Sequence, residues 1–260
     1  MTLWTMAHAK TLLPALAAML VTAAVLQILI GNKPLKTRMI PFQLLSCVLV
    51  VLEIGKQFLS LLQGYDLYYL PFHFCSLFIF ALPLMSFYNG KHQSTVREIT
   101  AALCAAVFLL MLIYPSLIYS ASNIEHFFDD YFSFHTVAFH NIVMFEFILI
   151  VALRLYTPVP RHETKAIVLF TIFFCGTAAV MSQLLKTNYA NFYTCNVPMF
   201  ENLRLRLQGI LGAGLTQLLY VTVVSVLHLL FVLLSYWAFC FLRRRTLQVN
   251  PDAQSTPARH

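Results

Sequence analysis

Charged side chains are scarce in this chain: Asp, Glu, Lys and Arg make up 10% of its 260 residues, against about 25% in an average soluble protein. Hydrophobic residues make up 60%, and the mean hydropathy is +0.76. So little charge leaves almost no chain for a water-soluble domain. The sequence also lacks the clustered basic domain that nucleic-acid binding requires, so no nucleic acid is expected as a partner.

Cysteines suited to disulfide bonds are lacking as well. Five of the six cysteines fall inside long apolar stretches, and only Cys195 lies in a connecting loop, so no disulfide framework is indicated. Low-complexity tracts and internal repeats are absent too. We therefore expect a single membrane domain over residues 1–245, followed by a disordered cytoplasmic tail over residues 246–260.

Long apolar runs are what the chain does have. A helix of about 20 apolar residues crosses a bilayer core of about 30 Å, and about seven such stretches are present. The expected spans are residues 11–31, 39–63, 71–88, 99–119, 134–156, 166–186 and 214–242. This pattern predicts an all-α polytopic membrane protein, a bundle of about seven transmembrane helices. It would lie in the cell membrane of a bacterium, or in the endoplasmic reticulum or another endomembrane of a eukaryote.

The basic residues predict the orientation of the bundle. Lys and Arg follow the first, third, fifth and seventh spans, whereas the loops at 64–70 and 120–133 hold neither. Loops that remain cytoplasmic carry an excess of Lys and Arg. We therefore expect the N-terminus outside or in a lumen and the C-terminus in the cytoplasm, and we read the net charge of +7 as a consequence of this topology.

Ionisable residues inside the expected spans gather at one depth. An ionisable residue inside a membrane costs roughly 2.5–3.5 kcal/mol on insertion scales and marks a candidate functional site. The cluster therefore indicates a polar cavity that opens to the outer side, although the i, i+3 spacing of Glu53 and Lys56 equally fits an ion pair within one helix. The residues at this depth, with hydrogen-bonding groups included, are Glu53, Lys56, His73, Cys75, His135, His140, Gln183 and Lys186.

The segment LPFHFC, residues 70–75, carries the candidate nucleophile. Pro71 is suited to begin a helix, and Cys75 would then lie near the positive end of the helix dipole, which favours the thiolate. His73 would lie about 200° around a regular helix from Cys75, so the base must come from another span. His135 has the matching depth, and a Cys–His pair activates a nucleophile for acyl transfer.

The remaining polar residues are expected to line the cavity or donate hydrogen bonds in it. The histidines and Cys75 together could form a tetrahedral nitrogen and sulfur set for zinc. Neither His-x-Cys nor His-x4-His is a familiar chelating spacing on helices, so no metal and no cofactor is predicted. The expected cavity residues are His73, His140, Glu53, Asn188 and Tyr189.

Three landmarks together resemble a known family. They are the LPFHFC segment, His135 in its apolar setting, and the sequence Lys186-Thr187-Asn188-Tyr189 with Pro198 downstream. These resemble the motifs of the YwaF integral membrane family, which is related to eukaryotic transmembrane protein 164. Size, number of spans and motif order agree over nearly the whole chain.

The resemblance implies a seven-helix membrane protein. For the eukaryotic branch it also implies an acyltransferase that moves a fatty acyl chain, notably a polyunsaturated one, from a phospholipid to a lyso ether phospholipid through a Cys–His pair. The positions that match this pair are Cys75 and His135. The segment after Tyr189 departs from the family pattern, and most bacterial-type members have no assigned activity.

The predicted function is acyl transfer between membrane phospholipid and lysophospholipid, with His135 as the base for Cys75. Water in place of the lysolipid would make the same mechanism that of a lipid esterase. The rival hypothesis is a transporter or channel for a small solute or ion that uses Glu53, Lys56 and the histidines as its path. A receptor is disfavoured because the motifs Asp-Arg-Tyr after the third span and Asn-Pro-x-x-Tyr in the seventh are absent.

Overall fold

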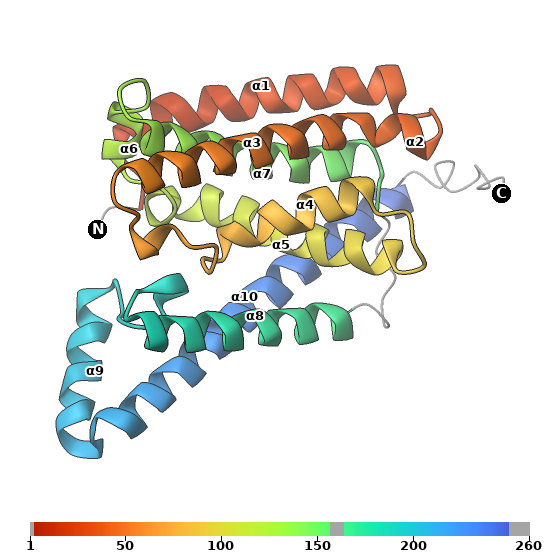
Figure 1. Ribbon diagram of the computed structural model, residues 1–260. Coiled ribbons are helices and arrows are strands. Elements are labelled where there is room, and N and C mark those ends of the chain that lie inside the picture. Colours follow the sequence, from red (N-terminus) through yellow and green to blue (C-terminus); the bar gives the residue numbers. More distant parts are fainter. Residues whose placement is uncertain (1–2, 157–163, 250–260) are drawn as a thin grey trace.

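The computed structural model describes residues 3–156 and 164–249, with side chains as far as residue 242. These residues form helices, turns and loops, and this described part contains no β-strand (Figure 1). The all-α class predicted from the sequence is therefore confirmed.

Within the described ranges, six helices are long and apolar enough to cross a membrane. The chain is therefore an integral, multi-pass membrane protein. A single turn, α2 (Leu35–Arg38), precedes the second of these helices. The six are α1 (Met6–Ile30), α3 (Ile40–Leu62), α5 (Gln93–Ile113), α7 (Tyr131–Ala152), α8 (Thr164–Leu185) and α10 (Ala213–Val249).

The third expected span, residues 71–88, differs from the prediction. Its helical part is Cys75–Phe87, made of the 3-10 turn η2 (Cys75–Leu77) and α4 (Phe78–Phe87), which at about 1.5 Å per residue is about 20 Å long. Leu70 is extended, with φ −60° and ψ 146°, because a following proline disfavours the helical conformation. The bundle therefore has about seven helices, of which this one is shorter than the bilayer core.

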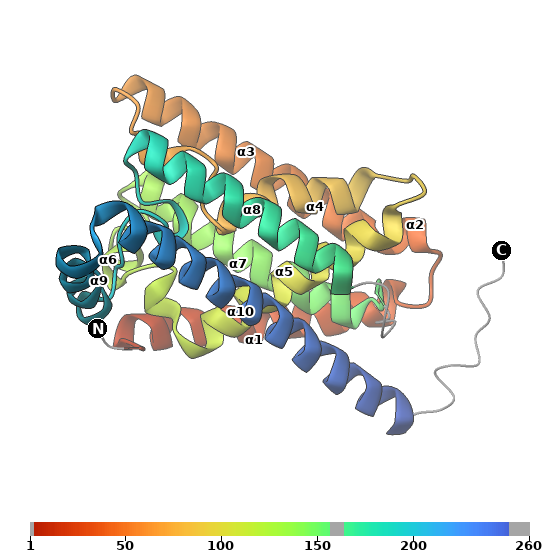
Figure 2. The ribbon, with the colours of Figure 1, turned by 90° about the horizontal axis from the view of Figure 1, so that it is seen from below.

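The helices stack in layers, with α1, α3 and α7 above α4 and α5, and with α8 and α10 below them (Figures 1 and 2). Helix α5 lies at the centre and packs against α4, α7, α8 and α10. Its residues 101–107, AALCAAV, are all buried, because small side chains let neighbouring helix backbones approach closely. The central layer separates the outer faces of the bundle and forms one wall of the cavity described below.

Short elements gather at one end of the bundle, on the left in Figure 1. Helix α9 lies there across the direction of the spans, in both Figure 1 and Figure 2. At the other end of the chain, α10 continues to Val249, past the expected domain end at 245, and residues 250–260 of the expected tail lie outside the described residues. The short elements are η1 (Leu67–Tyr69), η3 (Pro115–Leu117), α6 (Ala121–Glu125), η4 (Tyr189–Asn191) and α9 (Pro198–Leu211).

Candidate functional site

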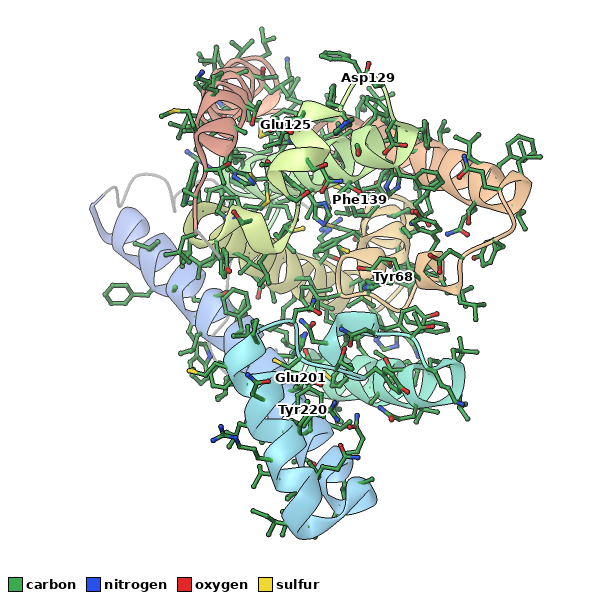
Figure 3. The ribbon with its side chains drawn as sticks, turned by 90° about the vertical axis from the view of Figure 1, so that its left-hand side faces the viewer. Tyr68, Glu125, Asp129, Phe139, Glu201 and Tyr220 are labelled. Carbon is green, nitrogen blue, oxygen red and sulfur yellow. The ribbon has the colours of Figure 1, made fainter. Side chains whose placement is uncertain are left out.

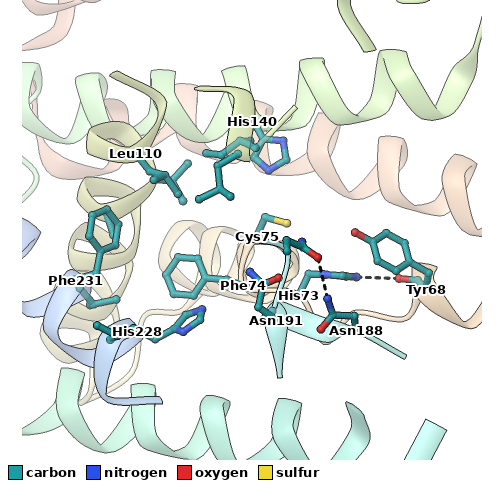
Figure 4. Close-up of a pocket in the computed structure, with 18 residues that line it drawn as sticks. Tyr68, His73, Phe74, Cys75, Leu110, His140, Asn188, Asn191, His228 and Phe231 are labelled. Carbon is teal, nitrogen blue, oxygen red and sulfur yellow. Dashed lines mark hydrogen bonds between the residues drawn. The ribbon is translucent and has the colours of Figure 1, made fainter. Parts of the chain in front are cut away.

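A cavity of about 430 Å³ lies between the central layer and α10, near the end of the bundle that carries η1 and η4. Its polar part comes from the segment before α4, from α7 and from the loop around η4. Its apolar part comes from α5, the η3 turn and α10, and α10 also contributes His228. The lining residues are Tyr68, His73, Phe74, Cys75, Ala106, Val107, Leu110, Leu117, Ile118, His140, Asn188, Ala190, Asn191, Asn196, Leu227, His228, Phe231 and Val232 (Figure 4).

Cys75 is the first residue of the helical segment that continues into α4. The four residues before it, 71–74, form turns rather than a helix, with the amide of Ser76 donating to the carbonyl of His73 at 3.0 Å. The helical-wheel separation of His73 from Cys75 therefore does not apply. Both side chains line the cavity, and Figure 4 shows the sulfur of Cys75 pointing toward the side that carries His140.

Three histidines line the cavity, and each uses one ring nitrogen on a backbone carbonyl. Nδ1 of His140 lies 2.7 Å from the Thr136 oxygen, and Nδ1 of His228 lies 2.9 Å from the Val224 oxygen. A carbonyl only accepts, so these nitrogens carry the proton and Nε2 keeps its lone pair in the neutral ring. His73 has the opposite arrangement, since its Nε2 donates to the Tyr68 carbonyl at 3.0 Å.

His135 belongs to a hydrogen-bonded ion network rather than to the cavity lining. Its Nε2 lies 3.1 Å from Oε2 of Glu53, and Oε1 of the same carboxylate accepts from Lys56 at 2.8 Å and from Gln57 at 2.7 Å. The i, i+3 ion pair that the sequence allowed is therefore formed. The network borders the cavity, because Lys56 and Glu53 are close enough to Cys75 to act on it electrostatically.

The loop around η4 closes the cavity at the polar end. Asn188 fixes this loop by accepting from the amides of Tyr193 and Thr194, both at 3.1 Å. Ala190 and Asn191 have positive φ angles of 47° and 65°, a left-handed conformation that Asn tolerates better than most residues. Oδ1 of Asn191 is buried and has no hydrogen-bond partner within the described part of the chain, so the cavity holds an unused acceptor.

Tyr189 is fully buried beside the cavity and does not line it. Its hydroxyl donates to the carbonyl of Leu67, and its ring packs against that of His73 with centroids 5.3 Å apart. It thus ties the η4 loop to the η1 turn. Viewed from the end of the bundle, Tyr68 lies between the upper layers and the α8–α10 layer (Figure 3).

Part of this lining is not predicted by the sequence. His228 is not among the cavity residues expected from the sequence. Its ring stacks on that of Phe192 with centroids 5.5 Å apart, and it also lines the cavity. Tyr68 and Asn191 lie in single 3-10 turns and Asn196 lies in a loop, where no periodic signal indicates which way a side chain points. Their only signal in the sequence is that they lie a few residues from expected cavity residues such as His73, Asn188 and Tyr189.

The cavity joins a thiol and imidazole acceptors at one end to an apolar compartment at the other. Among its described lining residues there is no Asp, Glu, Lys or Arg. The described part of the chain contains no group of three His, Cys, Asp or Glu side chains placed to hold a metal ion. Such a cavity suits a neutral ester that carries a long apolar chain, with a thiol as the attacking group.

The fold and this cavity define a multi-pass membrane protein with a Cys–His-lined site within its bundle. Residues 3–240 match the family model of the TMEM164 family. The match covers nearly the whole chain, so the protein belongs to the TMEM164 family, which confirms the resemblance seen in the motifs. No curated protein and no solved structure matches the chain.

Proposed function

We propose that this protein moves a fatty acyl chain between membrane phospholipid and lysophospholipid, with Cys75 as the nucleophile. The observation that carries the proposal is the position of Cys75, at a helix start with its sulfur facing a cavity that is polar at one end and apolar at the other. A volume of about 430 Å³ lies within the range of small-molecule sites.

The apolar end provides room for the acyl chain. Leu110 of α5 and Leu227 and Phe231 of α10 line it. Methylene groups of an acyl chain bound there would contact apolar side chains instead of water. The ester group would then lie at the polar end, beside Cys75. In the proposed arrangement, burial of the acyl chain orients the scissile carbonyl toward Cys75. No charged residue is needed for this, and the described lining contains none.

The base we propose is His135. Its Nε2–H donates to Glu53, which leaves Nδ1 as the accepting atom, and the adjacent carboxylate stabilises the imidazolium that forms when the ring takes a proton. His140 lacks such a carboxylate, since its Nδ1–H donates to a neutral carbonyl. Its free Nε2 would instead accept a hydrogen bond from a donor group of the bound lipid and so help to position it.

In the first half-reaction, His135 takes the proton of the Cys75 thiol and the thiolate adds to the ester carbonyl of a phospholipid. The tetrahedral intermediate collapses by breaking the bond between the carbonyl carbon and the alkoxy oxygen, which receives the proton from the imidazolium. A lysophospholipid leaves, and the acyl group remains as a thioester on Cys75.

In the second half-reaction, the hydroxyl of an acceptor lysophospholipid gives its proton to His135 and attacks the thioester. The sulfur leaves as thiolate and regains its proton from the imidazolium, so the enzyme returns to its starting state. Water in place of the lysolipid would complete hydrolysis by the same steps.

Tyr68 is the donor that we propose for the oxyanion. Burial raises the pKa of Tyr68, and the neighbouring Cys75 raises it further. The hydroxyl therefore keeps its proton at neutral pH and can donate a hydrogen bond. Figure 4 shows this hydroxyl directed into the cavity on the side of Cys75. His73, Asn188 and Tyr189, which the sequence offered for this role, already donate to protein oxygens.

The test is lipid profiling of cells that express the wild type or one of four variants, with acyl-probe labelling of the purified proteins. Cys75→Ala and His135→Asn should not be labelled by the acyl probe. Cells that express them should have the same lipid profile as cells that do not express the protein. His140→Asn should label but transfer more slowly. The matched control is Cys195→Ala, since Cys195 is a partly buried thiol outside the cavity lining.

Unchanged labelling and lipid profile in Cys75→Ala would refute the proposal. Loss of labelling in His140→Asn, with labelling kept in His135→Asn, would move the role of base to His140. The rival transporter predicts that Cys75→Ser is tolerated, whereas the proposed transferase predicts that it loses most of its activity. Glu53→Gln does not separate the two, because Glu53 also holds the proposed base His135.

A further inference from the structure

A second polar cavity, of about 390 Å³, lies at the end of the bundle opposite Cys75. It is formed where α2 and the start of α3 meet the connection between α4 and α5, elements that lie side by side in Figures 1 and 2. The lining residues are Leu35, Lys36, Met39, Gln43, Ser86, Asn89, Gln93 and Arg97.

Two of the three guanidinium nitrogens of Arg97 are buried at this cavity, although the residue as a whole is half-buried. Its Nε and Nη2 atoms have no hydrogen-bond acceptor within the described part of the chain. The Nε atom of the neighbouring Arg38 is buried and unpartnered as well, although its Nη1 donates to the Leu153 carbonyl at 2.8 Å. Buried donor atoms without an acceptor are unfavourable, and an anion that accepts from them would remove that cost.

No described lining residue supplies that anion. The lining carries Lys36 and Arg97 and no Asp or Glu, and Arg38 adds a further positive charge that acts on Arg97. The neutral side chains there donate to other groups, as Gln43 does to the Ser86 carbonyl at 3.2 Å. Among the described lining residues, no carboxylate compensates this positive charge.

The topology rule for membrane proteins does not account for this arrangement. It explains why Lys and Arg are abundant at this end of the bundle, and it is satisfied by exposed side chains such as Lys33 and Lys91. It does not explain why Arg97 has two donor atoms buried against a cavity. A ligand that accepts from those donors does.

We infer that this cavity binds a phosphate-bearing anion. Arginine pairs with phosphate oxygens through two parallel N–H groups, and Lys36 provides a second positive charge on the opposite wall. Helix α5 begins at Gln93, which lines the cavity, so the positive end of the helix lies beside the place proposed for the anion. No side-chain cap occupies the first amides of this helix. The phosphate could belong to a phospholipid head group or to a soluble molecule, and the inference is independent of the acyl-transfer proposal.

The test uses the full-length protein in phosphatidylcholine nanodiscs, with native mass spectrometry and thermal unfolding as readouts. One arm adds phosphatidic acid to the nanodisc, and the other adds inorganic phosphate to the buffer. The variants are Arg97→Gln and Lys36→Gln. The matched control is Lys91→Gln, which removes an exposed positive charge at the same end of the bundle but outside the cavity lining.

Wild type and Lys91→Gln should bind equally and melt at a higher temperature with the anion present. Arg97→Gln should bind about tenfold more weakly or worse, since it loses hydrogen bonds to a charged group. If Arg97→Gln does not fold, Lys36→Gln decides the question, because the Lys36 side chain is exposed and its loss should weaken binding several-fold without unfolding the protein.

Binding in the nanodisc arm alone identifies a lipid head group as the ligand, and binding of inorganic phosphate identifies a soluble one. The inference is overturned if neither probe binds to the wild type. It is also overturned if Lys91→Gln weakens binding as much as Lys36→Gln and Arg97→Gln do, because the effect would then be one of general surface charge.

Discussion

Replacement of Glu53 by Gln is expected to destabilise the bundle by about 3–5 kcal/mol, the cost of removing one partner of a buried ion pair. Three donors reach this carboxylate: Lys56 at 2.8 Å, Gln57 at 2.7 Å and His135 at 3.1 Å. The side chains of Glu53 and Lys56 are only 8% and 11% exposed. Without the carboxylate, Lys56 would remain as an uncompensated buried cation.

A double-mutant cycle measures this coupling. Glu53→Gln, Lys56→Met and the double variant would be compared by thermal and denaturant unfolding in one detergent. The double variant should be more stable than the sum of the single changes predicts, by about 1–3 kcal/mol, because it removes both members of the pair. The control is Glu125→Gln at an exposed carboxylate of α6, which should change stability by about 0.5 kcal/mol or less. Additive single effects would refute the proposed pairing.

Tyr68→Phe removes the proposed oxyanion donor and should lower kcat about 10²–10³-fold with an unchanged extent of lipid binding; an equal loss of binding would indicate a structural role. Asp130→Ala removes the N-cap of α7, where the carboxylate accepts from the amides of Phe132 and Ser133, and should cost about 1 kcal/mol in the free energy of unfolding, with Asp130→Asn restoring most of it. Hydrogen bonds from Arg204 hold the pKa of Glu201 below its usual value of 4.5. A lowered pKa in the folded state contributes stability that is complete above that value and is lost as the pH falls through the folded-state pKa. The melting-temperature difference between wild type and Glu201→Gln should therefore shrink on acidification, and a difference that grows would contradict the reasoning.

Hydrophobicity and length predict most of the fold. Six of the expected spans are present as long helices, because about 20 apolar residues in a membrane have no other way to satisfy their backbone groups. The exception is residues 71–88, where a run that is apolar enough contains a turn before Cys75. Hydropathy alone does not detect that interruption, although Pro71 restricts Leu70 and so marks the place.

The candidate site is less predictable than the fold. Depth along a span follows from residue number, and the structure does bring Cys75, His73 and His140 to one cavity. Rotation about the helix axis depends on packing against other helices. His135 and His140 belong to the same helix, yet the first faces Glu53 and the second faces the cavity. A hydropathy pattern that is apolar all round does not distinguish the two faces.

The loop around η4 shows a second limit. Asn191 reaches the cavity because Ala190 and Asn191 adopt left-handed conformations, which a single sequence does not specify for a non-glycine pair. His228 illustrates the same limit in a span, since every cavity-lining residue outside its own helix lies more than 30 residues away in the chain. Contacts of this kind are set by the tertiary fold.

The central claim is that an acyl group resides on Cys75 during turnover. The most direct measurement is the intact mass of the purified wild type after incubation with a diacyl phospholipid, followed by peptide mapping and treatment with hydroxylamine, which cleaves thioesters. The proposal predicts a mass increase of one acyl group on the peptide that contains Cys75, removed by hydroxylamine or by added lysophospholipid and absent from Cys75→Ala. Full acyl transfer by Cys75→Ala, or turnover by the wild type with the acyl group on a different residue, would contradict it.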